Sequence, residues 1–371
     1  MIGSAHAAPP VIKAVNEHME KFVKSQEIVG AVTLVADPEK TLHLAATGMA
    51  DSAEKKPMPA NAVFWIASMT KPVTAAAVMM MDEEGLLSVE DPVAKYLPEF
   101  RNLKDGAGKE VTVTIAQCLT HTSGLSELTP QEARAITTLA ALTPVVAEKP
   151  VKFEPGSKWE YCQTGINTAA RVVEVVSGKP FPEFLQERIF DPLGMTDTSF
   201  YPGPDQVKRL AVSYKKDGSG GLEATGLFFL NGESPSFKAR YPMANGGLFS
   251  TAEDYGKFAR MILRGGELDG KRYLKPESVA QMTAVNSGDL KAGFTPGSAW
   301  GLGWSIVREP QGVTGALSPG SYGHGGMFGT QAWIDPVKKR AYVLMIQRAD
   351  IGNSDASDIR RDFQNAAAPE S

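Results

Sequence analysis

The chain of 371 residues is poor in cysteine and histidine, which limits the chemistry that it can support. Two cysteines, Cys118 and Cys162, are too few for the disulfide framework of a small secreted domain. The five histidines stand far apart in the sequence, without the close spacing that metal ligands show. They are His6, His18, His43, His121 and His324. We therefore expect neither a metal ion nor another cofactor.

The chain also has no long apolar run and no large excess of charge of one sign. Its composition, 43% hydrophobic and 22% charged residues, is typical of a folded globular protein, and no stretch approaches the length of a membrane-spanning helix. The net charge of −4 and the lack of a dense lysine and arginine cluster argue against nucleic acid as a partner. A small molecule is the expected partner, and the sequence leaves the oligomeric state open.

The first ten residues carry a trace of processing. Residues 1–4 (MIGS) resemble a remnant of cloning, whereas residues 5–10 (AHAAPP) resemble the end of a signal peptide whose apolar stretch is missing. This pattern favours an exported, periplasmic protein from which the signal peptide has been removed.

Hydrophobic periodicity predicts the secondary structure of both ends of the chain. Helical spacing predicts helices over residues 11–27 and 355–367. Strands are expected where apolar or β-branched runs are bounded by turn residues, over 29–36, 42–46, 303–308, 329–334 and 341–347. Because both ends contribute strands, we predict one antiparallel sheet flanked by helices.

A long helix is expected near the middle of the fold. Residues 68–84 are rich in Ala, Val and Met, and Gly85 ends the pattern. Pro72 falls in the first turn of this helix, where its missing N–H costs little. The helix is apolar nearly all round, which is typical of a helix buried at the centre of a protein.

The chain is long enough for two lobes with separate cores. Between residues 86 and 222 the pattern is mostly helical, for example over 165–176 and 182–190. We therefore expect an α+β fold in which residues 1–85 and 223–371 form the sheet-containing domain and residues 86–222 form an inserted, mainly helical domain. The active site is expected in the cleft between them.

Residues 64–72 (FWIASMTKP) place Ser68 and Lys71 three positions apart at the start of the central helix. Side chains at i and i+3 share one face of a helix, so the hydroxyl and the amine can meet. A serine becomes a nucleophile when a neighbouring base takes its proton, and a lysine can do this where burial lowers its pKa. The helix start also directs the Ser68 backbone N–H towards developing negative charge. The same spacing occurs by chance in many chains, where it marks only a solvated helix N-terminus.

The surroundings of Lys71 favour the catalytic interpretation. Lys71 is the only charged residue between Lys56 and Asp82, so it stands in a long apolar context in which a solvated surface lysine is out of place. A buried lysine requires a partner or a function. A structural pairing with a distant carboxylate is the alternative.

Several further segments, in order along the chain, carry a resemblance to a known family. With residues 64–96, they are 121–125 (HTSGL), 153–156 (FEPG), 161–178, 245–252 (NGGLFSTA) and 324–326 (HGG). The chain resembles the β-lactamase-related serine hydrolases, which include class C β-lactamases, D-alanyl-D-alanine carboxypeptidases and family VIII carboxylesterases, and it is most like the last. The resemblance covers most of the chain and implies the α+β fold inferred above.

The second element of this family, Y-x-N, is represented here by Tyr161, Cys162 and Gln163. The resemblance implies that Tyr161 accepts or relays the serine proton. Gln163 replaces an asparagine that contacts the substrate and the lysine, with the same hydrogen-bonding groups on a longer side chain. The alternative for Tyr161 is a core tyrosine that caps the following helix.

The third element of the family, K-T-G or a variant, lies on an edge strand that faces the serine, and His324-Gly325-Gly326 represents it here. Glycines would let this strand approach the substrate closely. By resemblance, the backbone N–H of Met327 is the second oxyanion donor beside that of Ser68. His324 could instead be a surface strand residue near a turn.

Other conspicuous residues have milder interpretations. His121 and Ser123 are separated by one residue in a turn, which favours loop hydrogen bonding over a Ser–His pair. Cys162 is interpreted as a structural thiol, and residues 245–247 as a tight turn below the cleft floor. The chain has no G-x-S-x-G segment, so the α/β-hydrolase route to esterase chemistry lacks support.

These observations predict acyl transfer in two steps. Ser68 attacks a carbonyl while Lys71 and Tyr161 manage its proton, and water then hydrolyses the acyl-enzyme. The expected substrate is a carboxylic ester with a short or medium acyl chain. A β-lactamase or D-Ala-D-Ala carboxypeptidase is the alternative, and a catalytically silent relative that binds peptides or cell-wall fragments is another. Because the lysine acts as a neutral amine, activity is expected to rise from neutral to mildly alkaline pH.

Overall fold

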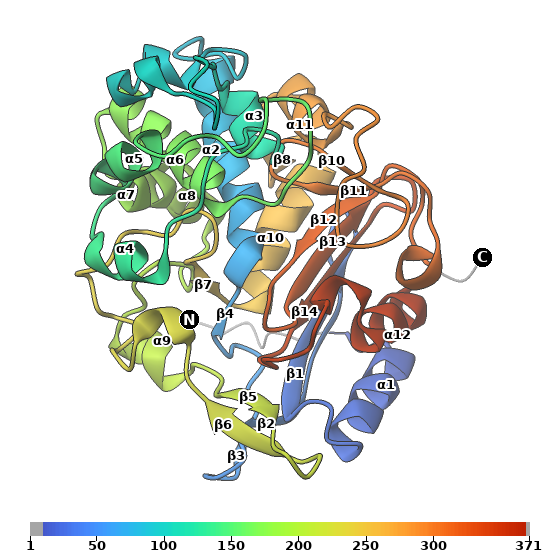
Figure 1. The fold of residues 1–371 in the computed structure, drawn as a ribbon. Helices are drawn as coiled ribbons and strands as arrows, with labels where there is room; N and C mark the ends of the chain where they lie inside the picture. The colour runs from blue at the N-terminus through green and yellow to red at the C-terminus, as the bar shows by residue number, and fades with distance from the viewer. Residues whose placement is uncertain (1–9, 369–371) are drawn as a thin grey trace, which may run out of the picture.

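A computed structural model describes residues 10–368, and an eight-stranded sheet is its main feature (Figure 1). All neighbouring strands pair antiparallel, in the order β10-β11-β12-β13-β14-β1-β2-β3. The N-terminal part contributes β1 (Gly30–Ala36), β2 (Thr41–Asp51) and β3 (Lys56–Pro57). The C-terminal part contributes β10 (Ser298–Trp300), β11 (Ser305–Val307), β12 (Tyr322–Gly325), β13 (Gln331–Asp335) and β14 (Arg340–Met345). The predicted antiparallel sheet built from both ends of the chain is confirmed.

Strand β1 lies inside the sheet because both of its faces are apolar. All seven of its residues are buried between β14 and β2. Alternate side chains of a strand point to opposite faces. Ala31 and Val35 belong to the core under two terminal helices, whereas Val32 and Leu34 belong to the main core on the other face. The helices against the two faces are α1 (Lys13–Lys24) and α12 (Asp358–Ala367), and, opposite them, α10 (Ala252–Leu263).

Helix α2 (Thr70–Glu83) crosses the middle of the molecule and begins just after Ser68. Every residue from Thr70 to Met81 is buried, which confirms the central helix predicted from its apolar surface. It contacts α6 (Gln163–Ser177) and α11 (Pro276–Thr283). Pro72 lies within its first turn, as expected.

A group of mostly short helices lies on the far side of α2 from the sheet (Figure 1). With α6, these are α3 (Ile115–Leu119), α4 (Pro130–Ala135), α5 (Leu139–Ala147), α7 (Phe181–Leu185), α8 (Asp191–Leu193) and α9 (Pro204–Lys208). Three small hairpins or pairs complete the fold: β4 (Phe64–Trp65) with β7 (Phe249–Ser250), β5 (Ser213–Lys216) with β6 (Leu222–Thr225), and β8 (Glu267–Leu268) with β9 (Lys271–Arg272). The predicted helical character of this part of the chain agrees with these elements.

The predicted boundary between residues 222 and 223 falls inside the hairpin β5–β6. Tyr214 of β5 also bridges to Arg348, and its hydroxyl accepts a hydrogen bond from the N–H of Ser52, so this hairpin is attached to the side of the sheet. We therefore propose that the helical lobe ends before β5. The division into two lobes remains a proposal.

Strand β12 was not expected from periodicity, because Gly323 and Gly325 weaken the strand pattern. It is not the edge strand that the family resemblance implied, since β11 and β10 lie beyond it. However, its pairing with β11 ends at Gly323. The stretch from His324 onwards is therefore unpaired on that side.

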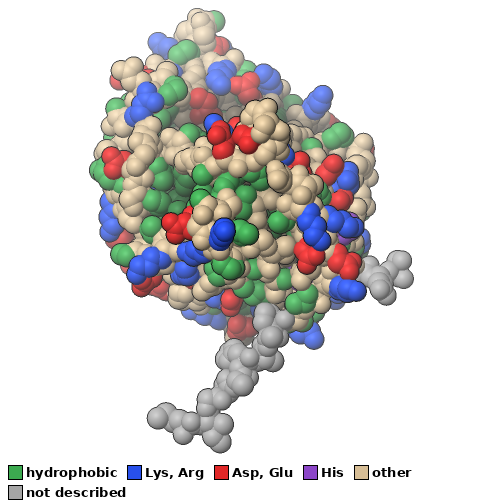
Figure 2. Space-filling model, turned by 90° about the horizontal axis from the view of Figure 1, so that it is seen from below, with side chains coloured by type: hydrophobic (Ala, Val, Ile, Leu, Met, Phe, Trp, Pro, Cys, Tyr) green, Lys and Arg blue, Asp and Glu red, His purple; other side chains and the backbone are tan. Residues whose placement is uncertain are grey.

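The molecular surface mixes charges of both signs, in keeping with the small net charge. Figure 2 shows hydrophobic side chains gathered near the middle of one face, with lysine, arginine, aspartate and glutamate side chains around them. Residues 1–9, which carry most of the predicted signal-peptide remnant, lie outside the described residues. Within residues 10–368, no helix has both the length and the apolar character that crossing a membrane requires.

Candidate active site

Ser68 lies in a tight turn between β4 and α2. The turn is a 3-10 helix, η1 (Ala67–Met69), and Ala67 has a left-handed backbone with φ of 46°. This conformation costs about 1–2 kcal/mol in a residue with a Cβ, so the surrounding contacts must hold it. The N–H of Ile66 donates to the carbonyl of Leu248 (3.0 Å), and the Thr70 hydroxyl donates to the carbonyl of Ala67 (2.7 Å). The turn leaves Ser68 half-buried at the wall of a cavity.

Lys71 is fully buried beside Ser68. Its Nζ donates hydrogen bonds to Ser68 Oγ (3.0 Å) and to the backbone carbonyl of Asn245 (2.6 Å), and it lies 4.6 Å from the centroid of the Tyr161 ring. Burial lowers the pKa of Lys71 from 10.5 to about 7, although the charge of Glu127 acts in the opposite direction. A neutral amine is therefore available at neutral pH to accept the Ser68 proton.

Asn245 connects Lys71 to helix α6. Its carbonyl accepts from Lys71, its Nδ2 donates to Gln163 Oε1 (2.9 Å), and its Oδ1 accepts from Asn167 Nδ2 (3.0 Å). Among the described residues Gln163 makes no direct hydrogen bond to the lysine. The contact that the family's asparagine makes with the lysine is thus replaced by a link through Asn245.

Tyr161 comes just before α6, and its ring faces Lys71. Its hydroxyl lies 3.4 Å from Nε2 of His324 and interacts with Ser68. The other rings around it, at centroid distances of 4.4 to 6.2 Å, are His121, Trp159, Phe294 and Trp300. Burial raises the pKa of Tyr161 well above its usual value, so its hydroxyl stays protonated and can donate a hydrogen bond or pass on a proton.

His324 is buried behind Tyr161 rather than on the cavity wall. Its Nδ1 lies 2.7 Å from the carbonyl oxygen of Gly325, which assigns the proton to Nδ1 and leaves Nε2 to accept from the Tyr161 hydroxyl. Burial, together with the charge of Lys71, lowers the pKa of His324 to about 3, so the imidazole is neutral. The buried imidazole is placed to position Tyr161, and its predicted contact with the substrate stays a prediction.

The glycines after His324 allow close packing within the protein. A Cβ on Gly326 would come 2.7 Å from the carbonyl oxygen of Ile66 and would collide with the Thr330 hydroxyl. A Cβ on Gly325 would collide with Asp355. Gly326 thus lets the strand pack closely against the turn that carries Ser68, and the predicted approach of these glycines to the substrate stays a prediction.

Met327 follows these glycines and lines the same cavity as Ser68. Its side chain is exposed, and among the described residues its backbone N–H has no hydrogen-bond partner. This N–H is therefore free to bind an oxygen atom of a ligand.

A cavity of about 600 Å³ opens beside Ser68. Its apolar wall includes Trp65, Leu128, Ile136, Phe228, Phe229, Leu230, Phe237, Tyr241 and Met243. Polar side chains that line the cavity with Ser68 include Gln163, Asn167 and Asn245. This combination of an apolar wall and a few polar groups is typical of small-molecule sites. Within residues 10–368, no group of three or more His, Cys, Asp or Glu side chains is arranged to hold a metal ion.

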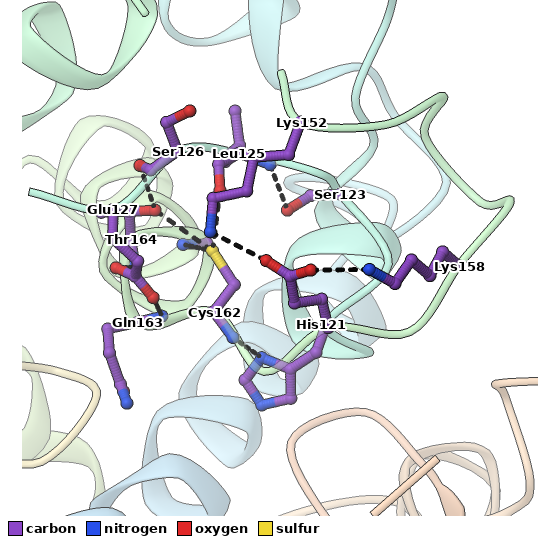
Figure 3. A network of polar contacts seen from close by, with 12 residues as sticks. His121, Ser123, Leu125, Ser126, Glu127, Lys152, Lys158, Cys162, Gln163 and Thr164 are labelled. Carbon is purple, nitrogen blue, oxygen red and sulfur yellow. Dashed lines mark hydrogen bonds and ion pairs between the residues drawn. The ribbon is translucent and has the colours of Figure 1, made fainter. Parts of the chain in front are cut away.

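A polar network supports the start of α6 (Figure 3). His121 Nδ1 accepts the backbone N–H of Cys162 (3.0 Å), and the Cys162 sulfur accepts the N–H of Gly165 (3.4 Å). Burial raises the pKa of Cys162 to about 11, so this side chain is a neutral thiol. His121 and Cys162 therefore have the structural roles that the sequence suggested.

Two residues of the site were missed in the sequence. Asn245 was assigned only to a turn, and its contact with Lys71 joins positions 174 residues apart. Glu127 follows the HTSGL segment without any motif of its own, yet its carboxylate lines the cavity and accepts the N–H of Gln163. No pattern among residues adjacent in the sequence predicts either contact.

Comparison with known proteins identifies the family of this chain. The Beta-lactamase family model matches residues 15–367. Protein Rv1367c of Mycobacterium tuberculosis is 33% identical over 88% of each chain, and Esterase EstB of Burkholderia gladioli is 28% identical over 90% of each chain. The solved structure of EstCE1, described as a hydrolase with promiscuous acyltransferase activity, is 25% identical, with a TM-score of 0.82 over 96% of this chain and 98% of that chain. The chain therefore belongs to the Beta-lactamase family and has its fold.

Proposed function

We propose that the protein is a serine carboxylesterase that forms an acyl-enzyme on Ser68. The observation that carries this proposal is the hydrogen bond of 3.0 Å between Lys71 Nζ and Ser68 Oγ, made by a buried lysine whose pKa is lowered to about 7. A base with a pKa near the working pH is the best compromise between being deprotonated and accepting a proton. Ser68 also lines a cavity able to hold an ester.

The proposed reaction has two steps. Neutral Lys71 takes the proton of Ser68 while Ser68 Oγ bonds to the ester carbonyl carbon, and the alcohol leaves with a proton delivered through Lys71 or Tyr161. Water then adds to the acyl carbon, the bond to Ser68 Oγ breaks, and the proton returns to Ser68. In both steps the backbone N–H groups of Ser68 and Met327 would stabilise the oxyanion.

Tyr161 is proposed to act as a protonated relay. Its hydroxyl interacts with Ser68 and is held by Nε2 of His324. Because burial keeps this phenol protonated, Lys71 rather than Tyr161 is the resting base. His324 is then a positioning residue, acting through Tyr161.

The proposed substrate is an ester with a short or medium acyl chain. Cavities of several hundred cubic ångströms enclose most of a drug-sized ligand, so about 600 Å³ also leaves room for a bulky apolar alcohol group. The esterase names of EstB and of a lovastatin esterase of Penicillium rubens, 29% identical over 77% of this chain, support ester hydrolysis.

A β-lactamase or D-Ala-D-Ala carboxypeptidase is the second candidate, favoured by the shared fold. Such substrates carry a carboxylate, which a cation beside the nucleophile helps to hold. His324 stands where many β-lactamases of the family have lysine, and its imidazole is neutral and fully engaged. This favours esters, because simple esters lack the carboxylate and need no such anchor.

The test compares kcat/KM for p-nitrophenyl butyrate and for a chromogenic cephalosporin on one preparation, with fluorophosphonate labelling of the same protein. We expect labelling of Ser68 and a strong preference for the ester. Ser68→Ala should abolish both labelling and turnover without unfolding, since this half-buried serine contributes about 1 kcal/mol or less to folding. A cephalosporin value equal to or above that of the ester would promote the β-lactamase candidate. A protein that neither labels nor turns over would be a silent binder.

A further inference from the structure

Glu127 places a carboxylate in the site, and the proposed reaction gives this carboxylate no role. Its Oε1 accepts the backbone N–H of Gln163 (2.5 Å) and its Oε2 accepts that of Thr164 (3.2 Å), both in the first turn of α6 (Figure 3). These two donors and the positive end of a 15-residue helix stabilise the ionised carboxylate. Burial acts in the opposite direction and raises the pKa of Glu127.

The same carboxylate lines the cavity beside Ser68 and Gln163. Of the other charged side chains on the cavity wall, Arg134 and Glu233 are exposed, and water screens their charges. Arg240 is a half-buried cation whose contacts are to neutral groups: its Nη2 donates to the carbonyl of Pro235 and its guanidinium stacks on Tyr201, while its Nε and Nη1 have no hydrogen-bond partner among the described residues. Among the residues that line the cavity, Glu127 is thus the partly buried anion.

Glu127 is also coupled to the nucleophile. The backbone N–H of Gln163 donates to Glu127, and the side-chain oxygen of Gln163 accepts a hydrogen bond from Asn245. The backbone carbonyl of Asn245 in turn accepts a hydrogen bond from Lys71. The negative charge of Glu127 raises the pKa of Lys71 against the effect of burial. The electric field of the Glu127 carboxylate therefore acts both on the cavity and on the reacting atoms.

We propose that Glu127 determines which substrate charge the site accepts: its carboxylate disfavours esters that place an anion in the cavity and favours neutral or cationic ones. This proposal rests on the esterase function proposed above. Within about 10 Å and at the effective dielectric of a protein site, repulsion between two unit charges changes a rate or binding constant about tenfold. The effect on the specificity ratio should be of that size.

The experiment uses two pairs of esters that differ only in charge. Mono-4-nitrophenyl adipate and its methyl ester place the charge in the acyl part, and 3-acetoxybenzoate and its methyl ester place it in the alcohol part. The quantity measured is kcat/KM of the anionic ester divided by that of its neutral partner. We expect the wild-type ratio to be about 0.1 or lower in at least one pair, and Glu127→Gln to raise it about tenfold in that pair.

Two further variants separate charge from structure. Glu127→Asp keeps the charge and should keep the wild-type ratio, and Glu233→Gln removes an exposed cavity carboxylate and should change the ratio less than twofold. If Glu127 were only a cap for α6, Glu127→Gln would lower stability and leave both ratios unchanged. That result would overturn the proposal.

The wild-type protein alone also tests the proposal if Glu127→Gln fails to fold. Equal kcat/KM values within both pairs, or a preference for the anionic ester, would overturn it, and a preference for the anion would point to Arg240 instead. Failure of the esterase function would look different. In that case the wild-type protein would turn over neither member of either pair, and fluorophosphonate would not label Ser68.

Discussion

Replacing the buried Lys71 by methionine should stabilise the protein while abolishing its activity. Burial lowers the pKa of Lys71 from 10.5 to about 7, a difference that corresponds to about 5 kcal/mol of disfavour for the charged amine. Lys71→Met removes this penalty and keeps most of the side-chain volume. The lost hydrogen bonds to Ser68 and to the Asn245 carbonyl offset it by about 2–3 kcal/mol. We therefore expect a net stabilisation of about 2 kcal/mol at pH 7.

The stability difference between Lys71→Met and the wild type should depend on pH. Between pH 7 and pH 10.5 the unfolded chain holds a proton on Lys71 that the folded protein has lost, so wild-type stability rises with pH in this window. The variant lacks this gain. Its advantage over the wild type should therefore shrink by about 2 kcal/mol between pH 7 and pH 9.

Urea unfolding followed by tryptophan fluorescence at both pH values measures the effect, and the difference between the two proteins cancels the titration of all other groups. Lys104→Met is a matched control at an exposed lysine, and its stability difference from the wild type should be the same at pH 7 and pH 9. If the difference in unfolding free energy between Lys71→Met and the wild type were the same at pH 7 and pH 9, the pKa of Lys71 would not be lowered in the folded protein. The assignment of Lys71 as the neutral base would then fail with it.

Three further predictions test the site. Tyr161→Phe removes only the hydroxyl, so a relay role predicts a rate loss of about 10²-fold or more with little change in unfolding free energy, whereas a loss of a few-fold would make Tyr161 a packing residue. In the wild-type enzyme, kcat/KM should increase with pH through about pH 7 as Lys71 loses its proton, and a profile flat from pH 6 to pH 9 would contradict this. Gly326→Ala should lower kcat at least tenfold, because its Cβ would press on Ile66 beside the nucleophile turn, and unchanged kinetics would show that the turn tolerates the shift.

The sequence alone was sufficient where neighbours along the chain determine the geometry. Ser68 and Lys71 meet because residues three apart share a helix face, and the apolar composition of α2 indicated its burial. Continuous apolar runs likewise predicted β1 and β14, and the family resemblance and the fold that it implied are confirmed.

The tertiary structure decided what depends on residues far apart in the sequence. Asn245 reaches Lys71 across 174 positions, and Glu127 binds the start of α6 across 36. His324 lies behind Tyr161 and does not line the cavity, and its two nitrogens find partners within the protein. Local periodicity records only which face of an element is apolar. The residues packed against that face, and the pKa values that their burial sets, follow from the assembled fold.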